Sequence, residues 1–366
     1  MDNSKKKRKQ NENNNGALIV TDNNSNKGTP KKSKKNNDLA IVTSQGGGKE
    51  IILGTERTSK LSSPIMHLTG HRGEVYTVKF DATGNLLASG GFDKEIFLWN
   101  VYGEECKNYS VLRGHKGAVL ELHWSTDSLE MYSASTDKSI GVWDVENSKL
   151  IKRIREHKSF INSCCPARRG PPLIASASDD NTSRVFDTRM KASTHSFKHQ
   201  FPVTSVCWTD ASDAVITGGI DNVIRVWDLR NSDEPSMVLN RHHDTITSLS
   251  VSKDGSYLLS NSMDNSVSMW DLRPYAPANR CLKTFIGAQH SFEKNLIKCS
   301  WSPDGNRVTA GSADRLVYVW DTNTTNLLYR LPGHSGTVNE VVFHPTEPII
   351  ASCSSDKTIY LGEIKP

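Results

Sequence analysis

A histidine, a hydroxyl and a carboxylate, the residue types of a nucleophilic catalytic triad, recur together along this chain. The carboxylate is an Asp that stands six residues before an aromatic position, with the hydroxyl four residues before the Asp and the histidine further upstream. The sets singled out here are His71, Ser89, Asp93 and Trp99; His115, Ser133, Asp137 and Trp143; and His334, Ser352 and Asp356. Ala310 replaces the hydroxyl in the sixth occurrence, and Phe186 and Gly362 replace the Trp in the third and seventh.

Two interpretations of these sets compete. An enzyme needs one triad in one pocket, whereas this set recurs about every forty residues and is followed by an aromatic position each time. A Trp N–H can only donate, a hydroxyl can donate and accept, an imidazole can bridge, and an Asp accepts, so the four groups can form one hydrogen-bonded chain. We therefore favour a structural role, with the catalytic triad as the alternative, and expect repeats three, six and seven to be less stiff.

The spacing of the aromatic positions defines the elements that carry these sets. Successive positions, from Trp99 to Gly362, lie 41 to 50 residues apart, and strand-like alternating runs and turn signals lie between them. This pattern resembles the WD-repeat family, whose repeats each form a four-stranded propeller blade. We expect an all-β, seven-bladed WD40 β-propeller over residues 61–366. Because the last repeat has room for only three strands, residues 64–68 should supply its outer strand and close the ring.

Residues 1–60 differ sharply in composition from the rest of the chain. Asn, Lys, Ser and Gly dominate, and no aromatic residue occurs there, so we expect a disordered tail. Its 13 Lys and Arg against 6 Asp and Glu give +7 where the whole chain carries +5, which leaves the propeller near −2. The tail contains a basic cluster at Lys5, Lys6, Lys7, Arg8 and Lys9 and a second one at 31–35, which read as nuclear localisation signals or loose phosphate contacts. A merely solubilising tail is the alternative.

The remaining composition excludes several classes of protein. No apolar run is long enough to span a membrane, and no signal peptide is recognisable. Seven cysteines without metal-ligand spacing fit a reduced compartment. We expect no cofactor, no metal, no membrane contact and no small-molecule substrate.

A closer resemblance covers residues 61–364 and includes loops outside the repeat consensus. Stretches such as IFLWNVYGEEC, SCCPARRGPPL and FEKNLIKCSWSPDG resemble the WD-repeat subunits of the spliceosomal U5 small nuclear ribonucleoprotein. That resemblance implies a non-catalytic nuclear scaffold subunit of the U5 snRNP in pre-mRNA splicing, which binds the particle's large scaffold protein. Because the ring is near −2, we expect RNA contact to be at most indirect or through the tail.

A different class of function competes with this one. Trp227-Asp228-Leu229-Arg230 and Trp270-Asp271-Leu272-Arg273 carry a W-D-x-R pattern, and Phe186-Asp187-Thr188-Arg189 nearly does. Arginines so placed resemble those that dock the adaptor in substrate receptors of cullin-RING ubiquitin ligases. The simpler interpretation pairs each Arg with a nearby exposed carboxylate.

By resemblance to WD propellers, particular loop positions point to the narrow top face and should bind partners. In this chain they are Glu74, Tyr76, Phe92, Leu120, Phe160, Asn162, Ile220, Met263 and Asn339. The alternative for these side chains is packing against neighbouring blades. Two further candidates are the long loops of the longest repeat, which include Tyr275, and the basic turn at Arg168 and Arg169.

Overall fold

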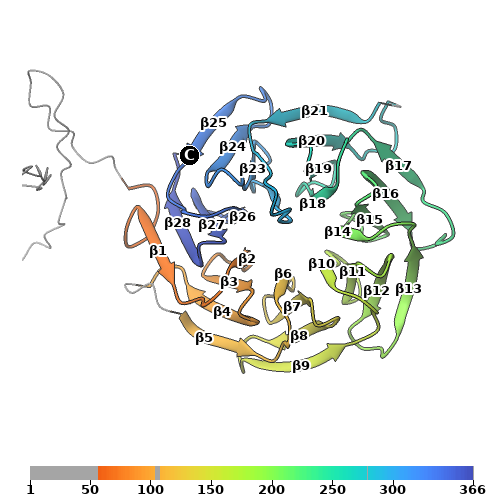
Figure 1. The fold of residues 1–366 in the computed structure, drawn as a ribbon, viewed down its shortest axis with the longest axis horizontal. Coiled ribbons are helices and arrows are strands. Elements are labelled where there is room, and N and C mark those ends of the chain that lie inside the picture. Colours follow the sequence, from red (N-terminus) through yellow and green to blue (C-terminus); the bar gives the residue numbers. More distant parts are fainter. Residues whose placement is uncertain (1–56, 104–107, 278, 366) are drawn as a thin grey trace, which may run out of the picture. The chain divides into compact units, whose positions relative to one another are not determined.

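The computed structural model describes residues 57–103, 108–277 and 279–365. Their 28 strands form seven four-stranded antiparallel sheets arranged as blades around a central channel (Figure 1). The predicted all-β, seven-bladed propeller is thus confirmed. The predictions made for the tail, including the basic cluster at 5–9, lie almost entirely outside the described residues.

Each blade runs from an inner strand beside the channel to an outer strand at the rim. Blade 1 contains β2 (Val75–Phe80), β3 (Leu86–Gly91), β4 (Glu95–Asn100) and β5 (Asn108–Arg113); blade 2 contains β6 (Val119–Trp124), β7 (Glu130–Ser135), β8 (Ile140–Asp144) and β9 (Lys149–Ile154); blade 3 contains β10 (Ile161–Pro166), β11 (Leu173–Ser178), β12 (Thr182–Asp187) and β13 (Ser193–Lys198). Blade 4 contains β14 (Val203–Trp208), β15 (Ala214–Gly219), β16 (Val223–Asp228) and β17 (Met237–Asn240); blade 5 contains β18 (Ile246–Val251), β19 (Tyr257–Ser262), β20 (Ser266–Asp271) and β21 (Cys281–Ile286). Blade 6 contains β22 (Cys299–Trp301), β23 (Arg307–Ala310), β24 (Val317–Asp321) and β25 (Leu327–Leu331); blade 7 contains β26 (Val338–Phe343), β27 (Ile349–Ser354), β28 (Thr358–Glu363) and β1 (Ile65–Thr69).

The hydrophobic core lies between blades. Every residue of the inner strand β14 is buried, whereas the outer strand β9 alternates between more exposed and more covered side chains. At the joint between blades 1 and 2, Leu98 of β4 packs in one cluster with Leu122 of β6 and Met131 of β7. Each sheet therefore buries both faces against its neighbours, which explains why the apolar pattern is continuous in inner strands and alternating in outer ones.

The ring closes as the sequence predicted. β1 pairs antiparallel with β28, from Ile65 opposite Gly362 to Thr69 opposite Thr358. Met66 and Leu68 of β1 are buried in a cluster that joins blades 7 and 1. The first strand of the propeller thus completes the last blade and covers the edge of β28.

Two sets of loops share one end of the channel, because neighbouring strands are antiparallel. These are the loops from each outer strand to the next inner strand and those from the second strand of a blade to its third. We call this end the top face and the opposite end the bottom face. No helix in the described part of the chain is long and apolar enough to cross a membrane.

Candidate interaction site

The recurring polar sets form buried hydrogen-bond chains in three blades. In blade 2, Trp143 Nε1 donates to Ser133 Oγ at 2.7 Å, Ser133 Oγ lies 2.6 Å from His115 Nε2, and His115 Nδ1 lies 3.0 Å from Asp137 Oδ2. Because the carboxylate only accepts, the imidazole donates from Nδ1 and accepts the serine O–H at Nε2. Blades 1 and 5 contain the same chain, built from His71, Ser89, Asp93 and Trp99 and from His242, Ser260, Asp264 and Trp270.

Blades 3 and 7 keep the chain without its Trp. His334 Nδ1 lies 3.0 Å from Asp356 Oδ2 and its Nε2 lies 2.9 Å from Ser352 Oγ. The ring of Tyr360 packs edge-on against His334 at a centroid distance of 4.7 Å. Blade 3 is built in the same way on His157, with Phe186 against the imidazole. Burial lowers the pKa of both histidines, so they are neutral at neutral pH.

Blade 4 departs from what its sequence suggests. It contains all four residue types, yet His199 lies beside Ser183 of the neighbouring strand, at 3.2 Å, and makes no bond to Asp221. Asp221 instead accepts from Arg225 Nη1 at 2.6 Å. A cation four residues along the chain thus competes successfully for the carboxylate, which a motif search that ignores position 225 could not anticipate.

In blade 6 the hydrogen-bond chain is broken at both ends. Tyr318 donates to Asp314 Oδ2 at 2.5 Å, and Trp320 Nε1 donates to the carbonyl of Ile286 at 3.2 Å. His290 Nδ1 is buried without a hydrogen-bond partner among the described residues. Burial lowers the pKa of His290 to about 4, so this imidazole stays neutral. The shorter chain predicted for blade 6 is therefore present.

The serines of these sets lie out of reach of a substrate. Ser89 and Ser133 are fully buried, and each receives the N–H of the blade's Trp on the same oxygen that contacts the imidazole. A nucleophile has to contact the atom that it attacks. This geometry supports the structural interpretation of the sets.

A belt of hydrogen bonds joins successive blades around the channel. In six blades the third residue of the inner strand follows a β-bulge, and its side chain accepts the backbone N–H of the next blade at 2.8 to 3.4 Å. The accepting residues, in ring order, are Thr77, Glu121, Ser163, Ser205, Ser248 and Glu340. The equivalent residue of blade 6 is Lys298, which carries no acceptor, so the belt has one gap between blades 6 and 7.

Lys298 instead crosses the channel. Its Nζ donates to the carbonyl of Leu120 at 3.0 Å and lies 3.3 Å from Glu121 Oε1 and 3.7 Å from Glu340 Oε2. Burial alone would raise the pKa of Glu121, but the ammonium of Lys298 holds it well below its usual range. Lys79 lies 2.5 Å from Glu340 and completes a buried network of two cations and two carboxylates. Four blades are therefore tied together through the channel.

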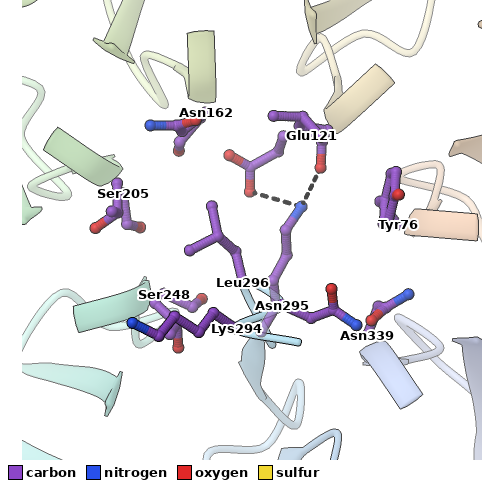
Figure 2. A pocket seen from close by; sticks show the side chains of 14 residues that line it. Tyr76, Glu121, Asn162, Ser205, Ser248, Lys294, Asn295, Leu296 and Asn339 are labelled. Carbon is purple, nitrogen blue, oxygen red and sulfur yellow. Dashed lines mark hydrogen bonds and ion pairs between the residues drawn. The ribbon is translucent and has the colours of Figure 1, made fainter. Parts of the chain in front are cut away.

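Above this network the channel widens into a pocket of about 200 Å³ on the top face. Figure 2 shows Lys294, Asn295 and Leu296 on one segment that reaches over the pocket, while Tyr76, Glu121, Asn162, Ser205, Ser248 and Asn339 come from strands around it. Lys294 and Asn295 belong to the extra residues of the longest repeat, one of the two long loops offered as binding candidates.

The predicted partner-binding residues do not form one site. Tyr76, Leu120, Asn162 and Asn339 line the top pocket. Asn162 and Asn339 are buried, and each donates its amide to the first inner-strand carbonyl of the next blade, at 3.0 and 2.7 Å. Both side chains thus bond to a neighbouring blade, because a side chain on a β-bulge at the channel points along the ring; partner binding by these asparagines stays a prediction. Glu74, half-buried, accepts from the hydroxyl of Tyr76.

Other predicted residues are exposed on the top face, where Phe92, Phe160 and Ile220 have 61, 47 and 46% of their surface exposed and Met263 is partly exposed. Sequence reasoning missed Phe201, which is 50% exposed in the loop before β14. It also missed the exposed Phe292 in the loop before β22. Both follow a loop histidine by two residues, a position that the rule of three and five residues does not cover. We call Phe160, Phe201, Ile220 and Phe292 the apolar arc; they lie on the top-face loops of blades 3, 4 and 6.

The two remaining candidates lie on the bottom face. Tyr275 is 100% exposed in the loop between β20 and β21. Arg168 donates to the carbonyls of Val251 and Ser252, and Arg169 lies 2.6 Å from Asp210. These arginines link blade 3 to blades 4 and 5, so intramolecular partners already occupy much of their hydrogen-bonding capacity.

Two of the three arginines singled out for the W-D-x-R pattern pair with the Asp two residues earlier. Arg273 contacts both oxygens of Asp271, and Arg189 contacts both oxygens of Asp187. Arg230 donates its backbone N–H to Asp228 and has no ion pair among the described residues. The pairing at 189 and 273 fits the simpler interpretation of this pattern.

Six cysteines are free thiols in the described part of the chain, and four of them are buried; Cys106 lies outside it. Burial raises the pKa of Cys165 to about 11 and that of Cys299 to about 12. Within the same residues, no cluster of three or more His, Cys, Asp or Glu could hold a metal ion.

Comparison with known proteins identifies the family to which this chain belongs. The WD domain, G-beta repeat family matches seven segments, at 62–100, 106–144, 148–187, 191–228, 233–271, 279–321 and 325–361. The U5 small nuclear ribonucleoprotein 40 kDa protein of Dictyostelium discoideum is 70% identical over 87% of this chain and 90% of its own length. The protein of the same name from Homo sapiens is 58% identical over 85% of this chain and 87% of its own, and the pre-mRNA-splicing factor cwf17 of Schizosaccharomyces pombe is 46% identical over 84% and 90%. The chain therefore belongs to the WD40-repeat family and, within it, to the family of U5 small nuclear ribonucleoprotein 40 kDa proteins.

Proposed function

We propose that this protein is a non-catalytic scaffold subunit of the U5 small nuclear ribonucleoprotein and acts in pre-mRNA splicing in the nucleus. The observation that carries the proposal is the 70% identity to a U5 40 kDa protein over 87% of the chain, a span that includes loops as well as strands. The rigid ring supports it, because interblade hydrogen bonds and the channel network fix the loops on which a partner docks. The buried serines support the non-catalytic assignment.

Within the particle, we propose that the large U5 scaffold protein binds the top face through the apolar arc. Large apolar side chains that stay half exposed on neighbouring loops are typical of interaction surfaces. A few such anchors usually supply most of the free energy of an interface. Phe160, Phe201 and Ile220 lie on blades 3 and 4, where the N–H of Ile220 bonds to the carbonyl of Pro202 and so fixes two of these loops against each other.

The test is purification of the tagged full-length protein from nuclear extract, with mass spectrometry and a probe for U5 RNA. The wild type should recover spliceosomal proteins and U5 RNA. Changing Phe160, Phe201 and Ile220 together to Ala should release the particle while the melting temperature stays within a few degrees of wild type.

The matched control changes three exposed apolar residues of the outer strands β9, β17 and β21 to Ala, namely Ile151, Val238 and Leu282. Recovery of no spliceosomal protein by the wild type would refute the function, and equal recovery by both triple variants would refute the apolar arc.

A further inference from the structure

A tight turn joins the second and third strands of every blade on the top face, and one residue of each turn adopts a left-handed backbone. The residue directly follows the Asp of the recurring polar set, and its φ lies between 62° and 72° in all seven blades. In blades 1, 2 and 7 its N–H bonds to the carbonyl three residues earlier at 3.2 to 3.3 Å. This position is therefore a fixed feature of the fold, and its side chain leaves the ring at the top face.

The residue at this position divides the ring into two halves. Blades 3, 4 and 5 hold Asn181, Asn222 and Asn265, the residue type other than Gly that tolerates the left-handed region best. Blades 6, 7, 1 and 2, which are consecutive around the closed ring in Figure 1, hold Arg315, Lys357, Lys94 and Lys138. A long β-unbranched cation is less favourable than Asn in this conformation. Four neighbouring blades thus accept a conformational cost that three blades avoid, so a role for these cations beyond folding is worth testing.

These four cations are exposed and have no ion-pair partner among the described residues. Two further exposed cations lie beside them, Arg72 on blade 1 and Lys116 on blade 2. Their backbone N–H groups donate to Asp93 and Asp137 at 3.1 and 2.9 Å, which fixes where the side chains emerge. We call these six residues the cationic arc.

The turn aspartates of blades 1, 2 and 7 point inward. The side chains of Asp93, Asp137 and Asp356 are only 7 to 8% exposed, because each is bonded to the histidine of its blade. Their charges therefore lie beneath the surface that the lysines present. A ring near −2 led us to expect RNA contact at most indirectly or through the tail, but the net charge averages over faces that the fold separates.

An aromatic side chain stands within the cationic arc. Phe92 is 61% exposed and directly precedes Asp93 and Lys94, and its backbone N–H bonds to the carbonyl of Glu74 at 2.8 Å. Exposed aromatic rings next to cations form the platforms on which proteins stack the bases of single-stranded nucleic acids. Phe160, Phe201 and Ile220 of the apolar arc lie on blades 3 and 4, so Phe92 has a setting separate from theirs.

We propose that the cationic arc of blades 6, 7, 1 and 2 binds the phosphodiester backbone of single-stranded RNA, with Phe92 stacking on a base. Cations spread over four blades require an extended polyanion rather than a single anionic group. Four of the six are Lys, which holds phosphate as a point charge, whereas carboxylates are best held by the paired donors of Arg. The stacking surface favours a nucleic acid over an acidic protein segment. The proposal goes beyond the proposed function and does not depend on it.

The test compares full-length variants, because the basic tail then contributes equally to every measurement. Lys94, Lys138, Arg315 and Lys357 are changed together to Asn, the residue that the other three blades hold at this position, so the fold should be kept or stabilised. The probe is a fluorescein-labelled 20-nucleotide oligouridylate, and binding is followed by anisotropy from about 50 to 300 mM salt. Each lost phosphate contact should reduce the slope of log K against log salt by about 0.7, so the slope should fall by about 3 and the affinity at 0.1 M salt by about 10- to 100-fold.

The control removes four positive charges from the bottom-face end by changing the exposed residues Lys149, Lys191, Lys253 and Lys365 to Asn. This control variant should bind RNA like the wild type.

Phe92→Leu keeps an apolar side chain without a stacking ring. It should lower the affinity for RNA by about tenfold, close to the effect of Phe92→Ala. Equal losses in both quadruple variants, or no loss in the top-face variant, would overturn the proposal. Loss of binding to a polyglutamate peptide with RNA binding unchanged would assign the arc to an acidic protein and overturn it as well. Each outcome is measured on purified protein, so it is separate from recovery of the U5 particle.

Discussion

Replacing Lys298 by Met should destabilise the ring strongly and make its stability depend on pH in a new way. The ammonium is the closest cation to Glu121, at 3.3 Å, and the side chains of Lys298 and Glu121 are 8 and 11% exposed. Glu340 keeps Lys79 at 2.5 Å, so one carboxylate loses its compensating charge. Removing one partner of a buried ion pair costs about 3–5 kcal/mol, a large part of the 5–15 kcal/mol that stabilises a typical domain. We expect the melting temperature to fall by roughly 6–10 °C.

The sign of the pH dependence follows from Glu121. In the wild type its pKa lies below the ordinary value, so its contribution to stability is present at neutral pH and is lost only in acid. Without Lys298, the pKa of Glu121 loses the largest cause that lowers it while burial still raises it, so we expect this pKa to rise and folding to favour the protonated carboxyl more than in the wild type. His123, 3.6 Å from Glu121, can also take up a proton in acid and compensate the charge. The difference in melting temperature between wild type and variant should therefore be smaller at pH 5 than at pH 8.

Two double variants make this test specific. Lys298→Met with Glu121→Gln keeps an acceptor for the N–H of Cys164 and removes the orphaned charge, so it should recover most of the lost stability. Lys298→Met with Glu340→Gln should recover nothing, because it deprives Lys79 of its partner. Scanning fluorimetry at pH 5 and pH 8 gives both comparisons. A pH-independent difference, or equal stability of the two double variants, would refute the reasoning.

Three further predictions concern the blades. Asp137→Ala removes the acceptor of a buried imidazole and should lower the free energy of unfolding by about 1–3 kcal/mol. Chemical denaturation should show that this loss and that of Ser133→Ala are not additive in the double variant. Unchanged stability together with a lost hydrolytic activity would contradict the structural role. Deleting residues 1–56 should leave the melting temperature nearly unchanged. Deleting residues 1–69 also removes β1 with its two buried side chains, so it should lower the melting temperature or cause aggregation. Equal stability of the two truncations would contradict ring closure by β1. Burial lowers the pKa of His199 from 6.5 to about 4, so the unfolded chain binds the proton first and stability falls as the pH is lowered from about 6.5 to about 4. His199→Gln should flatten this part of the curve of melting temperature against pH. An unchanged curve would count against a buried neutral imidazole.

Much of the fold could be predicted from local pattern. Alternating strands, turn residues and a regular repeat are properties of short segments, so the number of blades and even the closing strand β1 were readable. The site was less accessible. Asn162 and Asn339 were predicted to face partners but donate to neighbouring blades, because the bulge that turns them is a property of strand pairing. Blade 4 has every residue of the polar set and still lacks its histidine–carboxylate bond, since Arg225 competes for Asp221.

The sequence by itself determined the class of fold, the order of the strands, the recurring polar sets and, through resemblance, the expectation of a splicing subunit. These depend on residue types at fixed spacing along the chain. Only the tertiary structure brought Lys298 of blade 6 to Glu121 of blade 2, placed the lysines of blades 7, 1 and 2 away from the exposed apolar residues of blades 3 and 4, and turned the turn aspartates inward. Those arrangements depend on closure of the ring, which places residues far apart in the chain at the same depth of one channel, and no local pattern carries that information.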